Sequence, residues 1–289
     1  MYEYVCNYHC TRVCASEAIS LPFRSLIFPP LPVIFSELND ADGWVVQGKK
    51  ETLMPVWCGF YGVTCDINPN SPTYKSVLSI NTYNKALKGY LPTEIGYLTD
   101  LQSLDISTNR MNGTIPSQVG LMTSLTSLIL IRNLISGTIP PQIGLLTNLL
   151  ELEFDNNQLT GSIPSSLGNA TALTSVSITF NSLTGSIPST LSRLSHLKFL
   201  SLKTNKLQGS IPNSFSKLTR LTSFDVQSNY LTMEPFKRVP TSTFSNQTLN
   251  GYMNLHDNCL TFQYTLYDSD KNPTTTSFVG TNCAPSPSK

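Results

Sequence analysis

Glycines recur at a constant interval of 24 residues through the centre of the chain. They occupy positions Gly89, Gly113, Gly137, Gly161, Gly185 and Gly209. Chance placement would not hold one register through all of these glycines, so the interval indicates a structural unit that repeats along the chain. A unit of this length cannot bury an apolar face alone, and neighbouring units must stack on one another. The glycine register therefore predicts a solenoid.

Leucine, asparagine and proline keep the same register, and the asparagines recur from Asn109 to Asn229. Within LQSLDIS (101–107), Leu104 and Ile106 alternate with polar residues, which is the period of a strand with one buried face. A helical repeat would not tolerate glycine and Ile-Pro once in every unit. Each unit therefore predicts one short strand, and the stack predicts one parallel sheet.

The asparagine and the glycine of each unit have distinct predicted roles. The asparagine is expected to turn inward at the end of the strand, where its amide can satisfy backbone groups that the curving chain would leave unpaired. The glycine four residues later permits a positive φ, and the following Ile-Pro supplies a buried side chain and a fixed φ. These residues account for the turn and the start of the outer flank.

The unit LxxLxLxxNxLxGxIPxxLGxLTx, which covers about residues 77–235, resembles the plant-specific leucine-rich repeat of receptor-like kinase and receptor-like protein ectodomains. The resemblance implies an α/β repeat solenoid, a horseshoe or superhelix with one parallel β-sheet on its concave face and disulfide-capped ends. It implies about seven repeats. The first and last units are atypical, as terminal repeats are expected to be, with Lys85 in place of asparagine and Met233 in place of glycine.

The regions outside the repeats are expected to form caps and tails. Residues 1–32 are expected to be an N-terminal tail, either disordered or a misassigned or atypical leader, followed by an N-terminal cap at 33–76. Residues 236–289 are expected to form a C-terminal cap and tail. The segment WCGFYGVTCD (57–66) resembles the N-terminal cap of plant leucine-rich-repeat ectodomains.

All seven cysteines lie outside residues 66–258. By the same resemblance Cys58 and Cys65 bond to each other, and Cys259 and Cys283 form the natural second pair. Such disulfides persist in an oxidising compartment, which favours an extracellular or cell-surface location.

The N-terminus carries no clear signal peptide, because its start is polar and its later apolar stretch is interrupted by prolines. No stretch approaches the ~20 apolar residues of a membrane-spanning helix. Either the signal was removed, the start is misassigned, or the chain is not secreted.

The sequence disfavours several classes of function. Charged residues make up 13% of the chain and the net charge is +1, so no strong field attracts nucleic acid or an anionic membrane. Signatures such as GxSxG, HExxH and the phosphate-binding loop are absent, and no enzyme activity or cofactor is predicted. The spacing of Cys6, His9, Cys10 and Cys14 could suggest zinc ligation, but no second ligand pair follows, and we predict no metal.

Three asparagines have the sequence context of N-glycosylation acceptors: Asn112, Asn169 and Asn246. Triplets of this kind arise by chance in a chain this rich in asparagine, serine and threonine, so they do not themselves indicate secretion. Asn112 and Asn169 lie outside the predicted strands, and glycans there would leave the sheet open.

The outward positions of the predicted strands align in columns that are mostly small and polar. Apolar, aromatic and charged residues break this monotony in the middle repeats, at Ile129, Ile131, Arg132, Glu151, Glu153, Asp155, Phe180, Phe199 and Lys203. A mixed patch of this kind is typical of recognition surfaces. The alternative is that the apolar residues are ordinary surface residues and the acidic ones a solubilising face.

The sequence thus predicts a non-catalytic recognition module that binds a protein or peptide ligand on its concave sheet, as in receptor-like perception, and that could act with a co-receptor. One alternative is a secreted inhibitor of a cell-wall hydrolase, similar to the polygalacturonase-inhibiting proteins, which have more repeats by family resemblance. Another is a structural or intracellular adaptor, which free thiols at Cys58 and Cys65 would favour.

Overall fold

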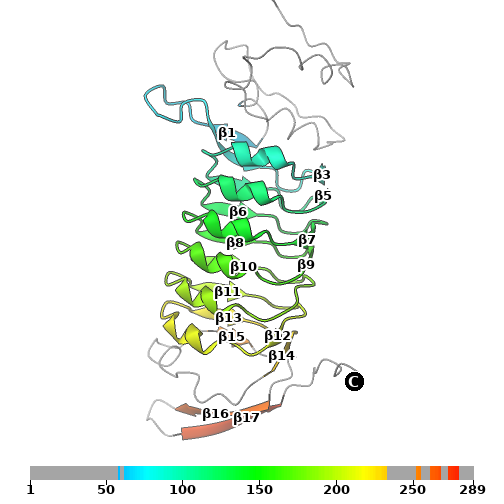
Figure 1. Ribbon diagram of the computed structural model, residues 1–289, viewed down its shortest axis with the longest axis vertical. Helices are drawn as coiled ribbons and strands as arrows, with labels where there is room; N and C mark the ends of the chain where they lie inside the picture. Colours follow the sequence, from blue (N-terminus) through cyan, green and yellow to red (C-terminus); the bar gives the residue numbers. More distant parts are fainter. Residues whose placement is uncertain (1–57, 59–61, 233–251, 255–260, 268–272, 280–289) are drawn as a thin grey trace, which may run out of the picture.

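A computed structural model describes residues 58, 62–232, 252–254, 261–267 and 273–279, and shows a solenoid of stacked coils (Figure 1). Each coil contributes one strand to a nine-stranded main sheet that runs the length of the stack. In spatial order its strands are β1 (Val63–Cys65), β2 (Val77–Asn81), β4 (Ser103–Asp105), β6 (Ser127–Ile129), β8 (Glu151–Glu153), β10 (Ser175–Ser177), β11 (Phe199–Ser201), β13 (Ser223–Asp225) and β15 (Tyr252–Asn254).

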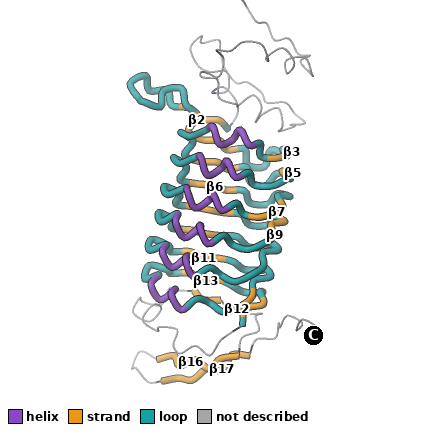
Figure 2. The backbone as a smooth tube through the Cα atoms, viewed as in Figure 1, coloured by secondary structure: helices purple, strands orange, loops and turns teal. Residues whose placement is uncertain are grey.

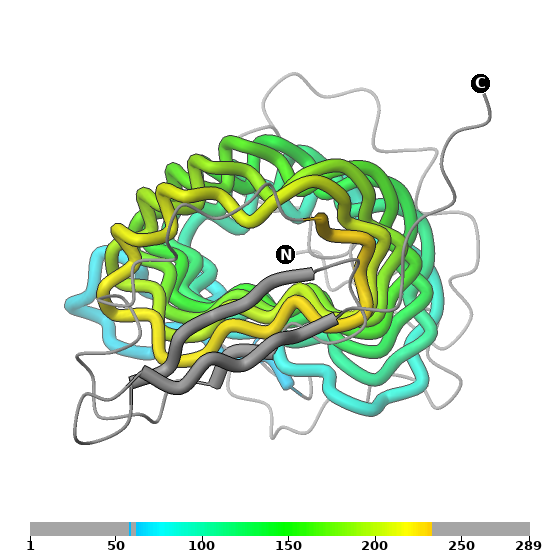
Figure 3. Tube along the Cα trace, turned by 90° about the horizontal axis from the view of Figure 1, so that it is seen from below, coloured from blue at the N-terminus to red at the C-terminus, as the bar shows by residue number. Residues whose placement is uncertain are grey.

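The main sheet is parallel from β2 to β15, as the repeat predicts. From β2 to β13 its register keeps the 24-residue interval, so that Leu104 pairs with Leu128 and Leu128 pairs with Leu152. These leucines are buried, and they join the cores of successive coils into one apolar column. Seen along the stack, each coil is slightly displaced from the one before it (Figure 3).

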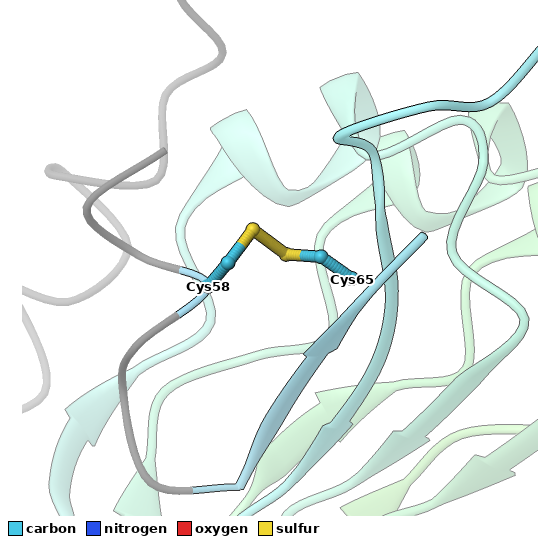
Figure 4. The surroundings of a disulfide bond; sticks show 2 residues. All are labelled: Cys58 and Cys65. Carbon is cyan, nitrogen blue, oxygen red and sulfur yellow. A yellow bond between two sulfur atoms is a disulfide. The ribbon is translucent and has the colours of Figure 1, made fainter. Parts of the chain in front are cut away.

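The first edge of the main sheet is covered by a strand of opposite direction. β1 pairs antiparallel with β2, with Val63 opposite Ile80. The predicted disulfide between Cys58 and Cys65 is confirmed, and it ties the end of β1 to the preceding segment (Figure 4). β1 thereby pairs the backbone groups that β2 would otherwise leave at the edge of the parallel strands.

The helical half of each coil is a short 3₁₀ segment. Six such segments line one side of the described solenoid in a single row (Figure 2): η2 (Thr93–Tyr97), η3 (Ser117–Leu121), η4 (Pro141–Leu145), η5 (Ser165–Asn169), η6 (Ser189–Arg193) and η7 (Asn213–Lys217). Each begins directly after a proline whose φ is fixed in the extended region, that of an Ile-Pro pair in η3 to η7 and of Leu91-Pro92 in η2. The α/β repeat is therefore confirmed with 3₁₀ segments in its helical half.

Adjacent 3₁₀ segments approach closely because four of them carry glycine at the same position. A Cβ placed on Gly144 would lie 2.2 Å from the carbonyl oxygen of Ser166 in the next coil. The glycine of the LGxLT part of the unit is therefore required by packing between coils.

A second set of short parallel strands lies on another side of the coils (Figures 1 and 2). Its pairs are β3 (Lys88–Tyr90) with β5 (Arg110–Asn112), β7 (Ser136–Thr138) with β9 (Gln158–Thr160), and β12 (Gln208–Gly209) with β14 (Tyr230–Leu231). Here a residue pairs with the residue 22 positions later, as Tyr90 does with Asn112. Beyond β15, an antiparallel hairpin is formed by β16 (Thr261–Tyr267) and β17 (Pro273–Val279).

The asparagines form an internal ladder, as predicted. The side-chain oxygen of Asn133 accepts a hydrogen bond from the backbone N–H of Met111 in the preceding coil. Its Nδ2 donates to the carbonyl oxygens of Ile106, also in the preceding coil, and of Leu130 and Ile131 in its own coil. Equivalent bonds are made by Asn109, Asn157, Asn181, Asn205 and Asn229. Each asparagine thereby satisfies backbone groups at the point where the strand ends.

Candidate ligand-binding surface

The register of the main sheet places the predicted columns side by side. One column runs through Asp105, Ile129, Glu153, Ser177, Ser201 and Asp225, each paired with the next. The nine residues singled out in the sequence lie on β6, β8, β11 and the segments that follow the strands of four successive coils. We call this set the central patch. It comprises Ile129, Ile131, Arg132, Glu151, Glu153, Asp155, Phe180, Phe199 and Lys203.

The acidic centre of the central patch lies on β8 and the residues just after it. Glu151 accepts a hydrogen bond from the Ser127 hydroxyl at 3.1 Å. Each carboxylate oxygen of Asp155 accepts a hydrogen bond from the Ser177 hydroxyl at 2.8 Å. Asp155 also accepts a hydrogen bond from the backbone N–H of Thr179. These bonds join three adjacent coils, so Glu151 and Asp155 are held in place by the scaffold.

Glu153 is the electrostatically distinct member of this centre. Its pKa is raised to about 7, first because the carboxyl is half-buried and then because of the negative charges of Glu151 and Asp155. A hydrogen bond with Glu151 and the charge of Asp105 act in the same direction. Crowded carboxylates of this kind favour a proton or another cation at Glu153 near neutral pH.

Apolar and cationic side chains lie on both sides of the acidic centre. Ile129 and Ile131 are half-buried on the preceding coil. On the other side, the ring of Phe180 is 46% exposed, and the Lys203 ammonium lies 5.9 Å from its centroid. This distance is within the range of a cation–π contact. Phe199 is exposed one strand further along the sheet.

Arg132 and Phe180 adopt an uncommon backbone conformation that the sequence did not predict. Their φ angles are +53° and +52°, and the same position is left-handed in every coil of the repeat: Asn84, Thr108, Arg132, Asn156, Phe180, Thr204 and Ser228. This conformation is unfavourable for side chains other than asparagine and glycine. The asparagine that follows each of these residues from Thr108 onward bonds to backbone on both sides of the turn, and this ladder holds the conformation.

Sequence reasoning left two relevant residues out of the central patch. Asp105 contributes to the raised pKa of Glu153 although it lies two strands away. Tyr83 is 55% exposed in the column that also contains Ile131 and Asp155. The sequence could have indicated Tyr83, because it is an aromatic residue among small and polar residues in the N-terminal part of that column.

The remaining predicted sites are placed as follows. Asn112 is exposed on β5, so the prediction that it lies outside the strands is wrong, although β5 belongs to the second set of strands and not to the main sheet. Asn169 ends η5, where its side-chain oxygen accepts a hydrogen bond from Arg193 Nη1 at 3.0 Å. Asn246, the proposed pair Cys259 and Cys283, and the cluster Cys6, His9, Cys10 and Cys14 lie outside the described residues. Within residues 62–232 and the shorter described segments, no three histidine, cysteine or acidic side chains gather as metal ligands would. In the same part of the chain, no helix has the length and apolar character needed to cross a bilayer.

Models of the leucine-rich-repeat family match three stretches of the chain, at residues 100–122, 148–170 and 171–231. A probable leucine-rich repeat receptor-like protein kinase of Arabidopsis thaliana is 35% identical over 94 residues, covering 29% of this chain and 9% of the relative. A leucine-rich repeat extensin-like protein of the same plant is 38% identical over 53 residues, 18% of this chain and 7% of the relative. The matches span under a tenth of each curated relative.

Solved structures with similar folds include plant receptors. The crystal structure of PEPR1-AtPEP1 matches with a TM-score of 0.67 and 32% identity, over 80% of this chain and 31% of that chain. The ectodomain of the Arabidopsis receptor kinase HAESA, in complex with an IDA peptide hormone ligand, matches with a TM-score of 0.61 and 26% identity, over 80% and 41% of the two chains. A plant ice-binding protein matches with a TM-score of 0.62 and 26% identity, over 80% of this chain and 78% of that chain.

Proposed function

Because this chain is a leucine-rich-repeat protein that resembles plant receptor ectodomains, we propose that it is a non-catalytic recognition module that binds a peptide or protein ligand across the central patch. The proposal rests on one observation. Charged, aromatic and apolar side chains gather on four successive coils of the main sheet, whose other outward positions are mostly small and polar. The likeness to a receptor ectodomain that holds a peptide hormone supports it. An extracellular or cell-surface location, and action with a co-receptor, belong to the same proposal.

The chemistry of the central patch favours an extended ligand with a basic and an apolar residue. Four strands span about 15 Å, enough for several residues of an extended peptide. A lysine or arginine of the ligand would compensate the crowded carboxylates at Glu153, and an apolar side chain would cover the ring of Phe180. Arg132 and Lys203 lie at the flanks, where they would select against further positive charge.

Selection of a random dodecapeptide phage library on the full chain tests this proposal. We expect enriched peptides to contain a basic and an apolar residue, and to bind about tenfold more weakly to a Glu153→Gln, Phe180→Ser variant. Asp155 is left unchanged because its hydrogen bonds hold the sheet. The matched control is Glu94→Gln, Leu145→Ser, which changes the same residue classes on the exposed 3₁₀ side. Enriched peptides that bind both variants and the unchanged chain equally would refute the proposal.

The two alternatives from the sequence differ in support. A disulfide between Cys58 and Cys65 argues against an intracellular adaptor, because cytosolic conditions keep thiols reduced. Inhibition of a cell-wall hydrolase stays a prediction from the sequence, which an inhibition assay with a purified polygalacturonase would test.

Adsorption to ice is a second candidate, favoured by the hydroxyl groups of the second set of strands. Exposed serine and threonine residues recur there in parallel register, at Thr114, Thr138, Thr160, Ser162, Thr184 and Ser186. Regular strand spacing of about 4.8 Å makes this a rigid, repetitive surface of the kind that can match a crystal of water. If this candidate holds, a Thr138→Lys, Thr160→Lys variant will lose inhibition of ice recrystallisation, whereas Thr147→Lys on the opposite side will keep it. Absence of inhibition in the unchanged chain would eliminate the candidate.

A further inference from the structure

A cavity of about 610 Å³ lies between the first two coils, on the side of the second set of strands. It is lined by Tyr90, Leu91, Pro92, Thr93, Glu94, Gly113, Thr114 and Pro116. The lining combines an aromatic ring, a carboxylate and two hydroxyl groups. This inventory suits a sugar, whose C–H face packs on an aromatic ring while its hydroxyl and amide groups hydrogen-bond to polar side chains.

The aromatic residue that lines this cavity is found in the first coil, and later coils have other residue types at its position. Tyr90 stands at the position that later coils fill with small hydroxyl residues, namely Thr114, Thr138, Ser162, Ser186 and Ser210. Its side chain is 45% exposed. A large, partly exposed aromatic side chain therefore replaces the small polar residue of the column at this point of the solenoid.

A glycosylation sequence lies against the same cavity. Asn112 is the register partner of Tyr90 in the β3–β5 pair, and both residues are exposed. Met111, which precedes Asn112 in β5, is buried. The next two residues of the acceptor triplet, Gly113 and Thr114, are themselves part of the cavity lining. A Cβ on Gly113 would lie 2.9 Å from that of Tyr90, so the glycine permits this close approach. Asn112 thus lies opposite one lining residue, Tyr90, in the strand pair, and precedes another, Gly113, in the chain.

We propose that Asn112 carries an N-linked glycan whose first N-acetylglucosamine occupies this cavity, packed on Tyr90 and hydrogen-bonded by Glu94 and Thr114. The Asn112 Nδ2 forms a bond to the anomeric carbon of a lipid-pyrophosphate-linked oligosaccharide. The bond from that carbon to the pyrophosphate breaks, the lipid pyrophosphate leaves, and the amide loses one proton. No oxidant or reductant takes part. The proposal rests on the extracellular location proposed above, and it is independent of any peptide ligand.

The other described acceptor has different surroundings. Asn169 ends a 3₁₀ segment and its side-chain oxygen is engaged by Arg193. A glycan at Asn169 would extend into solvent. The two acceptors can therefore be compared within one protein, because the sugar on Asn112 would contact the protein and the sugar on Asn169 would not. A seated sugar would join the first coil to the second, close to the disulfide-bonded end of the solenoid.

The test uses the full chain, secreted from a eukaryotic host that attaches N-glycans. Mass spectrometry is expected to find Asn112 occupied. Removing the whole glycan with a peptide N-glycosidase is expected to lower the thermal midpoint by about 2–4 °C, and trimming to one N-acetylglucosamine is expected to leave it unchanged. Tyr90→Thr, which copies the residue of the next coil, should abolish the difference, whereas Asn169→Gln should preserve it.

A second measurement does not depend on the folding of the Tyr90 variant. In the unchanged glycoprotein, the acetyl methyl resonance of the sugar on Asn112 should shift upfield under the tyrosine ring relative to the sugar on Asn169. An unoccupied Asn112, equal methyl shifts, or a thermal difference that survives Tyr90→Thr would each overturn the proposal.

Discussion

The side-chain oxygen of Asn133 accepts the backbone N–H of Met111, 22 residues earlier, at 3.0 Å. Asn133 is only 6% exposed, so this donor has no access to water if the asparagine is lost. Asn133→Ala is expected to reduce the free energy of unfolding by about 1–3 kcal/mol, because it leaves the buried N–H of Met111 unpaired and removes one of two hydrogen bonds at each of three carbonyl oxygens. Urea unfolding measures the change.

The control for this prediction is Asn148→Ala, which removes an exposed asparagine that also bonds to the preceding coil, at Thr123. It is expected to change the free energy of unfolding by less than about 0.5 kcal/mol. Equal effects of the two substitutions would show that burial of the ladder does not matter.

The disulfide between Cys58 and Cys65 is expected to stabilise the N-terminal end of the solenoid locally. Closing so short a loop contributes about 2–3 kcal/mol in the chain-entropy model. A Cys58→Ser, Cys65→Ser variant should therefore show faster amide exchange in β1 and β2, with little change at β10 and β11, because each coil contacts only its neighbours. Hydrogen exchange followed by mass spectrometry gives the readout, and a uniform increase along the chain would contradict the local role.

Much of the fold follows from the sequence because the 24-residue register is constant. The alternation around Leu104 predicts a buried strand face, and Asn133 predicts an inward amide; both are found in the structure. The second set of strands was not predicted, since its pairing of residue i with residue i + 22 departs from the 24-residue register of the sequence.

The candidate surface could be predicted only in part. The columns followed from register, but the half-burial of Ile129 and the raised pKa of Glu153 depend on distances between coils. The cavity beside Tyr90 likewise requires two coils to be seen together. The sequence does not predict the left-handed position before each asparagine, because residues as different as Arg132 and Phe180 occupy it.

That left-handed position leads to a stabilising substitution. Thr204 is β-branched and has a φ of +54°, a conformation that Asn156 adopts at the same position two coils earlier. Thr204→Asn is expected to raise the free energy of unfolding by roughly 1 kcal/mol, because asparagine tolerates this region far better than threonine. Thr147→Asn, at an exposed site outside the left-handed region, should have no such effect in the same denaturation experiment. A gain at both sites would point to the amide itself as the cause.

The raised pKa of Glu153 predicts how stability depends on pH. The carboxyl titrates near pH 7 in the folded chain and near pH 4.5 when unfolded, so between these values the folded chain binds more protons than the unfolded chain. Its contribution to stability is therefore complete below about pH 4.5 and is lost as the pH rises to about 7. Glu153→Gln, which stays neutral, should flatten this decline in urea unfolding measured at a series of pH values. Glu94→Gln, which removes a half-buried carboxylate of η2 outside the central patch, should leave the decline in place; a decline that persists in Glu153→Gln would assign it to other groups.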